Sequence, residues 1–299
     1  MKDFREIEAP VQSLGYTNAV RGYVNVQNSN LEDELELPRL VFANRLFKDW
    51  IPQKSIEGYS STHTTDEWSA VVRAVERALP FYETISEIIS MGLAGPLRRR
   101  AIRKLERYRT DWILDSGTGP GTSSRLLLED GFEKIAGLDP SMTLLRHAKV
   151  ALGPNFSPVT GVAESLPFRS NAFSGVLTCF SFRDVRDKAL SMGEFARVGN
   201  REARLEIVDV GKPDGTFQRR LITLYVALIM PIIARFFISG RTTGNPFQMI
   251  VPTFHRLAKN RSMTQLAEEE FGSARLHEFL LGGLVIIDAE RTTVVERAD

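Results

Sequence analysis

The stretch Trp112–Gly121, which reads Trp-Ile-Leu-Asp-Ser-Gly-Thr-Gly-Pro-Gly, decides how the rest of the chain is interpreted. An apolar run leads into a turn with glycine at Gly117, Gly119 and Gly121. Residues 122–130 begin with Thr and Ser and are followed by glycine, which is typical of a helix with a defined start and stop. The pattern predicts the first strand–turn–helix unit of a nucleotide-binding α/β sheet, where a Cβ atom in the turn would collide with the ligand.

The spacing within this turn indicates the kind of ligand. It is Asp-x-Gly-x-Gly-x-Gly, counted from Asp115, and not the Gly-x-Gly-x-x-Gly of dinucleotide-binding sheets. We therefore expect a nucleoside ligand without a pyrophosphate, and S-adenosylmethionine fits best. A glycine-rich turn alone is weak support, because a tight turn that binds nothing has the same composition.

A second apolar run, Ile135–Asp139, ends in an acidic residue. In sheets of this kind a carboxylate at this place accepts both ribose hydroxyls of a bound nucleoside. Pro140 suits the start of the helix that we expect at Met142–Leu152. The alternative role of Asp139 is therefore to cap that helix.

The composition excludes several classes of protein. The 299 residues are 43% hydrophobic and 25% charged, which is ordinary for a globular chain with a sizeable core. The net charge of +1 provides no overall electrostatic footprint for nucleic acid. Cys179 is the single cysteine, so internal disulfides and cysteine-based zinc clusters are excluded. Residues 1–10 show no signal peptide, so we expect a cytoplasmic protein. We also expect no metal site.

The later part of the chain continues the α/β pattern. Residues 173–180 and 204–210 are expected strands, and the stretch Phe180–Val185 leaves the carboxyl end of the first of them, where ligands bind in such sheets. Asp209 lies at the end of the second strand. Residues 187–198 and 257–270 are expected helices, and residues 275–281 and 284–289 an antiparallel hairpin.

We divide the chain into an N-terminal extension, residues 1–70, with no assigned role, and one domain, residues 71–299. Within that domain, residues 217–256 are expected to form an apolar helical insertion. Its run Leu221–Gly240 contains Pro231 and Arg235 and is a poor membrane span. Either it is a helix pair covering the sheet, or it is a lid that accepts a lipid tail and dips into the bilayer surface.

A basic amphipathic helix is expected at Leu97–Arg109. Its arginines form either a solvated face or a patch that meets anionic lipid headgroups or an acidic group of the cofactor.

From about Val75 to Ala289 the chain resembles the ubiquinone/menaquinone biosynthesis C-methyltransferases, a family of class I S-adenosylmethionine-dependent methyltransferases. Several blocks carry the resemblance in the family's order and spacing. They are Phe81–Glu83, Met91–Leu93, Leu97–Ala101, Gly137–Met142, Ala163–Phe168, Phe180–Val185, Asp187-Lys188 and Gly282-Gly283.

The resemblance implies a Rossmann-like seven-stranded α/β sheet with helices on both faces, and methylation of a prenylated quinol. It also implies which residues contact S-adenosylmethionine. These are Tyr82, Asp115, Gly117, Thr118, Gly119, Asp139, Pro140, Met142, Ala163, Glu164 and Phe180. Asp115, Gly117 and Gly119 are assigned to the methionine part, Asp139 to the ribose, and Ala163 and Glu164 to the adenine, while Tyr82 closes over the cofactor.

The sequence departs from the family at three places. Val162 stands where the family has an Asp for the adenine amino group, so Glu164 or a backbone group must substitute. Asp184 replaces the Asn of an Arg-Asn-Val signature. Residues 199–202 replace a Lys-Pro-Gly-Gly turn, and the departures together indicate a divergent member whose acceptor differs.

We expect Arg183 and Asp184 to be catalytic. Asp184, with Asp209, accepts the phenolic proton or orients the hydroxyl, and Arg183 stabilises the phenolate. The alternative is an Arg183–Asp184 pair that only shapes its loop. A different lipid or small-molecule acceptor, and a relative that binds the cofactor without catalysis, also stay open. We expect contact with the inner face of the membrane, no nucleic-acid partner, and leave a homodimer open.

Overall fold

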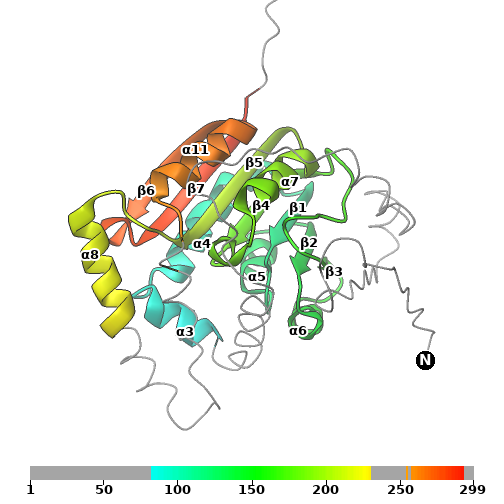
Figure 1. Ribbon diagram of the computed structural model, residues 1–299. Coiled ribbons are helices and arrows are strands. Elements are labelled where there is room, and N and C mark those ends of the chain that lie inside the picture. The colour runs from blue at the N-terminus through cyan, green and yellow to red at the C-terminus, as the bar shows by residue number, and fades with distance from the viewer. Residues whose placement is uncertain (1–81, 230–253, 255–256, 293–299) are drawn as a thin grey trace, which may run out of the picture.

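The structure is a computed structural model that describes residues 82–229, 254 and 257–292 (Figure 1). The extension at residues 1–70 and most of the expected insertion at residues 217–256 lie outside the described residues. Helical elements are α3 (Tyr82–Ile89), α4 (Ala94–Lys104), η3 (Glu106–Tyr108), α5 (Thr122–Glu129), α6 (Met142–Leu152), η4 (Phe182–Asp184), α7 (Lys188–Val198), α8 (Thr216–Leu224), η5 (Tyr225–Ile229), α11 (Asn260–Phe271) and η7 (Leu280–Gly282).

The strands form one seven-stranded sheet in the order β3-β2-β1-β4-β5-β7-β6, which confirms the expected α/β class. They are β1 (Trp112–Ser116), β2 (Lys134–Asp139), β3 (Phe156–Thr160), β4 (Phe173–Cys179), β5 (Gly199–Val210), β6 (Gly272–Phe279) and β7 (Leu284–Arg291). The first five are parallel, and β7 pairs antiparallel with both β5 and β6.

The strand order reverses between β1 and β4, because the chain first moves outward through β2 and β3 and then returns to the other side of β1. In open α/β sheets the ligand crevice lies outside the carboxyl ends of the strands at this reversal. The topology therefore places the glycine-rich turn after β1 beside the stretch Phe180–Val185 after β4.

Both faces of the sheet are covered by helices, and neighbouring strand residues face opposite cores. Ile113 packs in one core with Leu105, which directly follows α4, and with Leu127 of α5. Leu114 packs in the other core with Phe195 of α7, in the same cluster as residues of α11. Strands buried on both faces explain why their sequences are continuous apolar runs rather than alternating ones.

Several element boundaries differ from those expected from the sequence. β3 was not expected: it carries Pro158, which a strand at the sheet edge tolerates because one side of it needs no hydrogen bonds. β5 begins at Gly199, five residues before the expected Arg204, across an irregularity in its pairing with β4. α4 ends at Lys104 and gives way to the 3₁₀ turn η3, so the expected helix to Arg109 was too long.

Among the described residues, no helix combines the length and apolar character that a membrane crossing requires.

Candidate active site

The three glycines of the turn after β1 all have positive φ angles, of +71° at Gly117, +54° at Gly119 and +88° at Gly121. A Cβ atom at Gly117 would lie 2.3 Å from Oγ of Ser181, and one at Gly121 would lie 2.8 Å from Leu152. At Gly119 a Cβ atom would meet nothing within 4 Å. Two of the glycines therefore permit close packing within the protein, and Gly119 leaves open space where a ligand can approach the backbone.

Asp115, one residue before the end of β1, carries a buried carboxylate and is 1% exposed. Its Oδ2 accepts hydrogen bonds from Thr118 Oγ1 at 2.8 Å and from Ser124 Oγ at 2.6 Å. Its Oδ1 is buried and accepts no hydrogen bond from the residues that the structure describes. Burial raises the pKa of Asp115, and the hydrogen bonds from Ser124 and Thr118 and the charge of Arg98 oppose the rise. An orphan acceptor of this kind fits a ligand that donates a hydrogen bond.

Asp139, the last residue of β2, is hydrogen-bonded both to the glycine-rich turn after β1 and to the turn that follows β2. Its Oδ2 accepts from the Gly119 amide at 2.9 Å, and its Oδ1 from the Ser141 amide at 2.8 Å. The side chain that caps α6 is that of Ser141, whose Oγ accepts from the Leu144 amide at 3.2 Å. The helix cap that we considered as the alternative role of Asp139 is therefore provided by Ser141. Pro140 and Met142 are half-buried beside it.

The loop after β3 holds the residues assigned to the adenine. Ala163 is buried, and Val162 forms an isolated bridge with Ser165. Glu164 Oε1 accepts from the amides of Arg186 at 2.8 Å and Asp187 at 3.4 Å. That carboxylate oxygen connects its loop to the segment after η4, and the contact of Glu164 with adenine stays a prediction.

Phe180, directly after β4, has a left-handed backbone with φ of +58°, which is rare for a residue other than glycine. Its amide donates to the carbonyl of Val208 at 2.7 Å, which holds this conformation. Its ring lies beneath the guanidinium of Arg98, 4.6 Å from ring centroid to Cζ. Strained residues held in place by their surroundings cluster at ligand sites.

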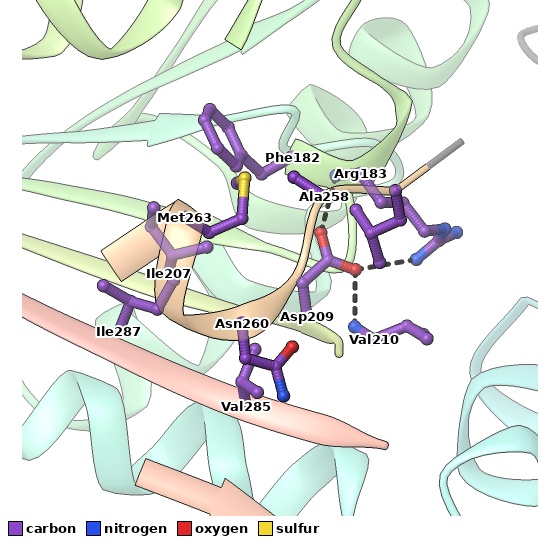
Figure 2. Close-up of a pocket in the computed structure, with 11 residues that line it drawn as sticks. Phe182, Arg183, Ile207, Asp209, Val210, Ala258, Asn260, Met263, Val285 and Ile287 are labelled. Atoms are coloured by element: carbon purple, nitrogen blue, oxygen red, sulfur yellow. Dashed lines mark hydrogen bonds and ion pairs between the residues drawn. The ribbon is translucent and has the colours of Figure 1, made fainter. Parts of the chain in front are cut away.

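The structure brings Arg183, Asp184 and Asp209 together at the carboxyl ends of β4 and β5. Figure 2 shows Asp209 accepting from the backbone amide of Arg183 at 2.8 Å, from its Nη1 at 3.1 Å and from the Val210 amide at 2.7 Å. Arg183 Nη2 lies 3.3 Å from Asp184 Oδ2. Burial raises the pKa of Asp184, and the charges of Arg183 and Lys188 oppose the rise.

Lys188, at the start of α7, is buried beneath this cluster with 1% exposure. Its Nζ donates to the carbonyls of Arg183 at 3.2 Å and Val185 at 2.8 Å. Burial lowers the pKa of Lys188 to about 8. The sequence alone does not reveal that Lys188 is buried, since a lysine at the start of a helix has no pattern that distinguishes it from a surface residue.

A cavity of about 20 Å³ adjoins the cluster, lined by Phe182, Asp209, Met263 and Val285 among others (Figure 2). This is room for about one water molecule. Its size excludes it as the place where an aromatic acceptor binds. Tyr82 is the first residue of α3, and its side chain lies outside the described part of the chain.

Several of the predicted cofactor residues lie at the carboxyl ends of the neighbouring strands β1 and β2, and their chemistry suits S-adenosylmethionine. Open space at Gly119 accommodates the approach of a ligand to the backbone, the orphan oxygen of Asp115 suits an ammonium group, and Asp139 lies at the strand end that takes a ribose.

Comparison with known proteins supports the same assignment. A family profile described as a methyltransferase domain matches residues 113–201. The chain is 27% identical over 168 residues to the demethylmenaquinone methyltransferase of Thermotoga maritima, covering 56% of this chain and 73% of that protein. It is 28% identical over 186 residues to a ubiquinone/menaquinone biosynthesis C-methyltransferase of Hahella chejuensis, covering 59% and 74%.

Among solved structures, the plantazolicin methyltransferase BamL has a TM-score of 0.51 and 12% identity, over 77% of this chain and 99% of that one. This likeness concerns the fold alone. The fold, the crevice and the sequence relatives agree, and the protein is a class I S-adenosylmethionine-dependent methyltransferase.

Proposed function

We propose that this methyltransferase acts on a ring carbon of a prenylated quinol, in the manner of ubiquinone or menaquinone biosynthesis. The relatives named above support this acceptor. The observation that carries the chemistry is the cluster of Arg183, Asp184 and Asp209, one strand away from the glycine-rich turn.

S-adenosylmethionine, when bound, supplies a methyl group that its sulfonium already activates. The protein has to hold the acceptor in line with that methyl and to exclude water. The buried carboxylates and the close contact of the turn at Gly117 with Ser181 provide a packed wall for this purpose. Rigid placement of reactants accounts for a large part of the barrier reduction in such transfers.

The acceptor also has to lose a phenolic proton, because the phenolate carries more electron density at the neighbouring ring carbon. Asp184 takes this proton in our proposal, since its raised pKa brings it closer to that of the hydroxyl it serves. Arg183 stabilises the negative charge on the ring oxygen. The competing explanation is that the ion pairs of Arg183 with Asp184 and Asp209 only shape the loop.

An assay of methyl transfer to reduced demethylmenaquinone distinguishes the two explanations. We expect Asp184→Asn to lower kcat by about 10²- to 10⁴-fold, the usual contribution of a general base, with unchanged affinity for S-adenosylhomocysteine. Asp111→Asn, at an exposed position just before the amino end of β1 and so at the end of the strand away from the site, is the matched control. Full turnover in Asp184→Asn would remove the catalytic role. No transfer by the wild-type protein to any prenylated quinol would favour another lipid or small-molecule acceptor.

We further propose that the first part of the expected insertion contacts the membrane surface, where a prenylated substrate resides. Phe217, Leu221, Leu224 and Leu228 recur at helical spacing along α8 and η5 and are 71%, 38%, 54% and 55% exposed. Arg220 adds an exposed cation. An exposed apolar stripe with a basic neighbour is typical of helices that lie in a lipid interface.

Flotation with anionic vesicles tests this contact. We expect the wild-type protein to float with the vesicles and Leu224→Glu/Leu228→Glu to remain in the lower fractions, because charges on the stripe oppose insertion. The exposed Val150 of α6 provides the control substitution, Val150→Glu. Wild-type protein that stays entirely in the lower fractions would refute the proposal.

A further inference from the structure

The structure separates the expected basic face of α4 into cations with and without acidic partners. Arg99 lies 3.0 Å from Glu129 and 3.5 Å from Asp130, at the end of α5. Arg100 points elsewhere, because its guanidinium lies over the ring of Phe279 on β6, with 5.4 Å from Cζ to the ring centroid. Arg100 therefore faces the edge strand of the sheet and not the acids beside α5.

The side chains of β6 that face α4 follow from the strand register. Alternate residues of a strand share one face, so Arg275, His277 and Phe279 lie on the same side of β6. Arg275 pairs with Asp288 of β7, and directly opposed residues also share a face. The Asp288 carboxylate lies 3.6 Å from Lys104 of α4, so this is the face that α4 covers. Arg275 and His277 are therefore directed toward the side of the sheet on which α4 lies.

Four cationic or titratable side chains thus meet between α4 and β6. This cation cluster consists of Arg100, Lys104, Arg275 and His277. Burial lowers the pKa of His277, and the positive charges of the other three members lower it further, against the opposing charge of Asp288. The Nε2 atom of His277 is buried and has no hydrogen-bond partner among the described residues.

The one acid beside the cation cluster is already engaged. Asp288 is 4% exposed and forms ion pairs with Lys104 and with Arg204 of β5. Within the described part of the chain, neither Arg100 nor Arg275 belongs to an ion pair, and both are exposed. Surfaces that hold like charges together raise the local concentration of their counter-ions. The cation cluster therefore favours an anion from outside the protein.

The position of the cation cluster indicates the source of that anion. β6 leads directly into η7, whose Leu281 is 63% exposed and has a left-handed backbone with φ of +58°. The next residue after η7, Gly283, lies so close to Ile222 of α8 that a Cβ atom would be 2.7 Å from its Cδ1. The strand that carries the cations thus ends beside the exposed apolar stripe of α8. Cations next to an apolar stripe match the boundary between lipid headgroups and acyl chains.

We infer that the cation cluster binds the phosphate group of an anionic lipid headgroup, while the stripe of α8 lies among the acyl chains. A guanidinium fork matches the oxygens of a phosphate, and two such forks come from different elements here. A free phosphate offers the same oxygens, but the adjoining apolar surface favours the lipid. The inference rests on the membrane contact proposed above and not on the quinol acceptor.

Titration of the His277 imidazole by nuclear magnetic resonance tests the headgroup contact without a membrane. The probe is dihexanoylphosphatidylglycerol below its critical micelle concentration, and His277→Gln assigns the resonance. We expect the bound phosphate to raise the pKa of His277, since a nearby anion favours the imidazolium. Arg100→Gln/Arg275→Gln should weaken this binding on the order of 10- to 30-fold. An imidazole that does not respond to the lipid would overturn the inference, and so would a response to inorganic phosphate alone.

Vesicle flotation separates the cation cluster from the stripe of α8. With vesicles that contain phosphatidylglycerol, Arg100→Gln/Arg275→Gln should bind on the order of 10-fold less than the wild type, and with pure phosphatidylcholine it should equal the wild type. Leu224→Glu/Leu228→Glu should lose binding to both kinds of vesicle.

The matched control is Arg146→Gln/Arg261→Gln, which removes two exposed arginines from α6 and α11 and changes the net charge equally. It should float like the wild type. Equal loss in this control would show that net charge and not the cation cluster attracts the lipid, and would overturn the inference. Wild-type protein that does not float would refute the contact of α8, whereas the His277 titration decides the headgroup contact separately.

Discussion

Gly117 and Gly119 lie two residues apart in one turn, and their different surroundings give them different structural roles. Both have positive φ angles, which cost a side-chain-bearing residue about 1–2 kcal/mol. Gly117 additionally lies against Ser181, whose Oγ donates to the Ser116 carbonyl at 3.1 Å and thereby connects the ends of β1 and β4. Gly119 faces open space.

We therefore predict different results for alanine at the two positions. Gly117→Ala should lower the free energy of unfolding by more than about 2 kcal/mol, because strain and overlap with Ser181 add together. Gly119→Ala should cost about 1 kcal/mol but reduce the affinity for S-adenosylhomocysteine strongly. Thermal unfolding and calorimetry measure the two effects.

The double variant Gly117→Ala/Ser181→Gly is the control, since it removes both atoms of Ser181 that a Cβ at position 117 would overlap. It should regain most of the stability that Gly117→Ala loses. Equal loss of stability in both single variants would show that the contact with Ser181 does not distinguish them.

At the scale of elements, a buried charged network connects β5, β7 and α4. Arg204 Nε donates to Glu206 at 3.1 Å, and Arg204 also binds Asp288 of β7 at 2.8 and 3.0 Å. Lys104 of α4 lies 3.6 Å from Asp288. Burial raises the pKa of Glu206 well above its ordinary value, and the negative charge of Asp288 adds to the rise.

This raised pKa predicts how stability depends on pH. Between the pKa of Glu206 in the unfolded chain and its higher pKa in the folded protein, the folded state binds the extra proton, so stability falls as pH rises through that window. Glu206→Gln mimics the protonated acid and removes the fall. We therefore expect the variant to gain in thermal midpoint relative to wild type as pH rises from 5 to 8, with about 2–4 °C for each kcal/mol.

Glu202→Gln, at an exposed position on the same strand, is the matched control and should follow the wild type at every pH. A midpoint of Glu206→Gln that lies below the wild type by the same amount at pH 5 and pH 8 would show that Glu206 is ionised in the folded protein.

At the scale of the whole molecule, the strand order assembles the site from distant segments. β1 and β4 are neighbours although two strands and two helices separate them in sequence, and this adjacency joins the turn at Gly117 to Ser181. α4 precedes the sheet in the chain and packs against the same face as α5, which brings Arg98 to Phe180. The candidate site is therefore a product of topology as much as of its motifs.

The sequence by itself determined the α/β class, most elements and the candidate crevice. Continuous apolar runs that end in Asp115, Asp139 and Asp209 predict buried parallel strands with acids at one edge, since short-range periodicity and strand ends are local properties. Local signals were weakest at β3, where Pro158 argues against a strand, and at the early start of β5.

Only the tertiary structure decided what the individual side chains do. Arg98 is an arginine like its exposed neighbours, and Gly117 and Gly119 are both glycines. No local sequence pattern therefore distinguishes their roles. Arg98 is buried because packing turns one stripe of α4 toward the sheet. Gly117 became a packing residue because β4 returns beside β1. Burial and partner choice depend on segments far apart in the chain, and these come together only when the sheet forms.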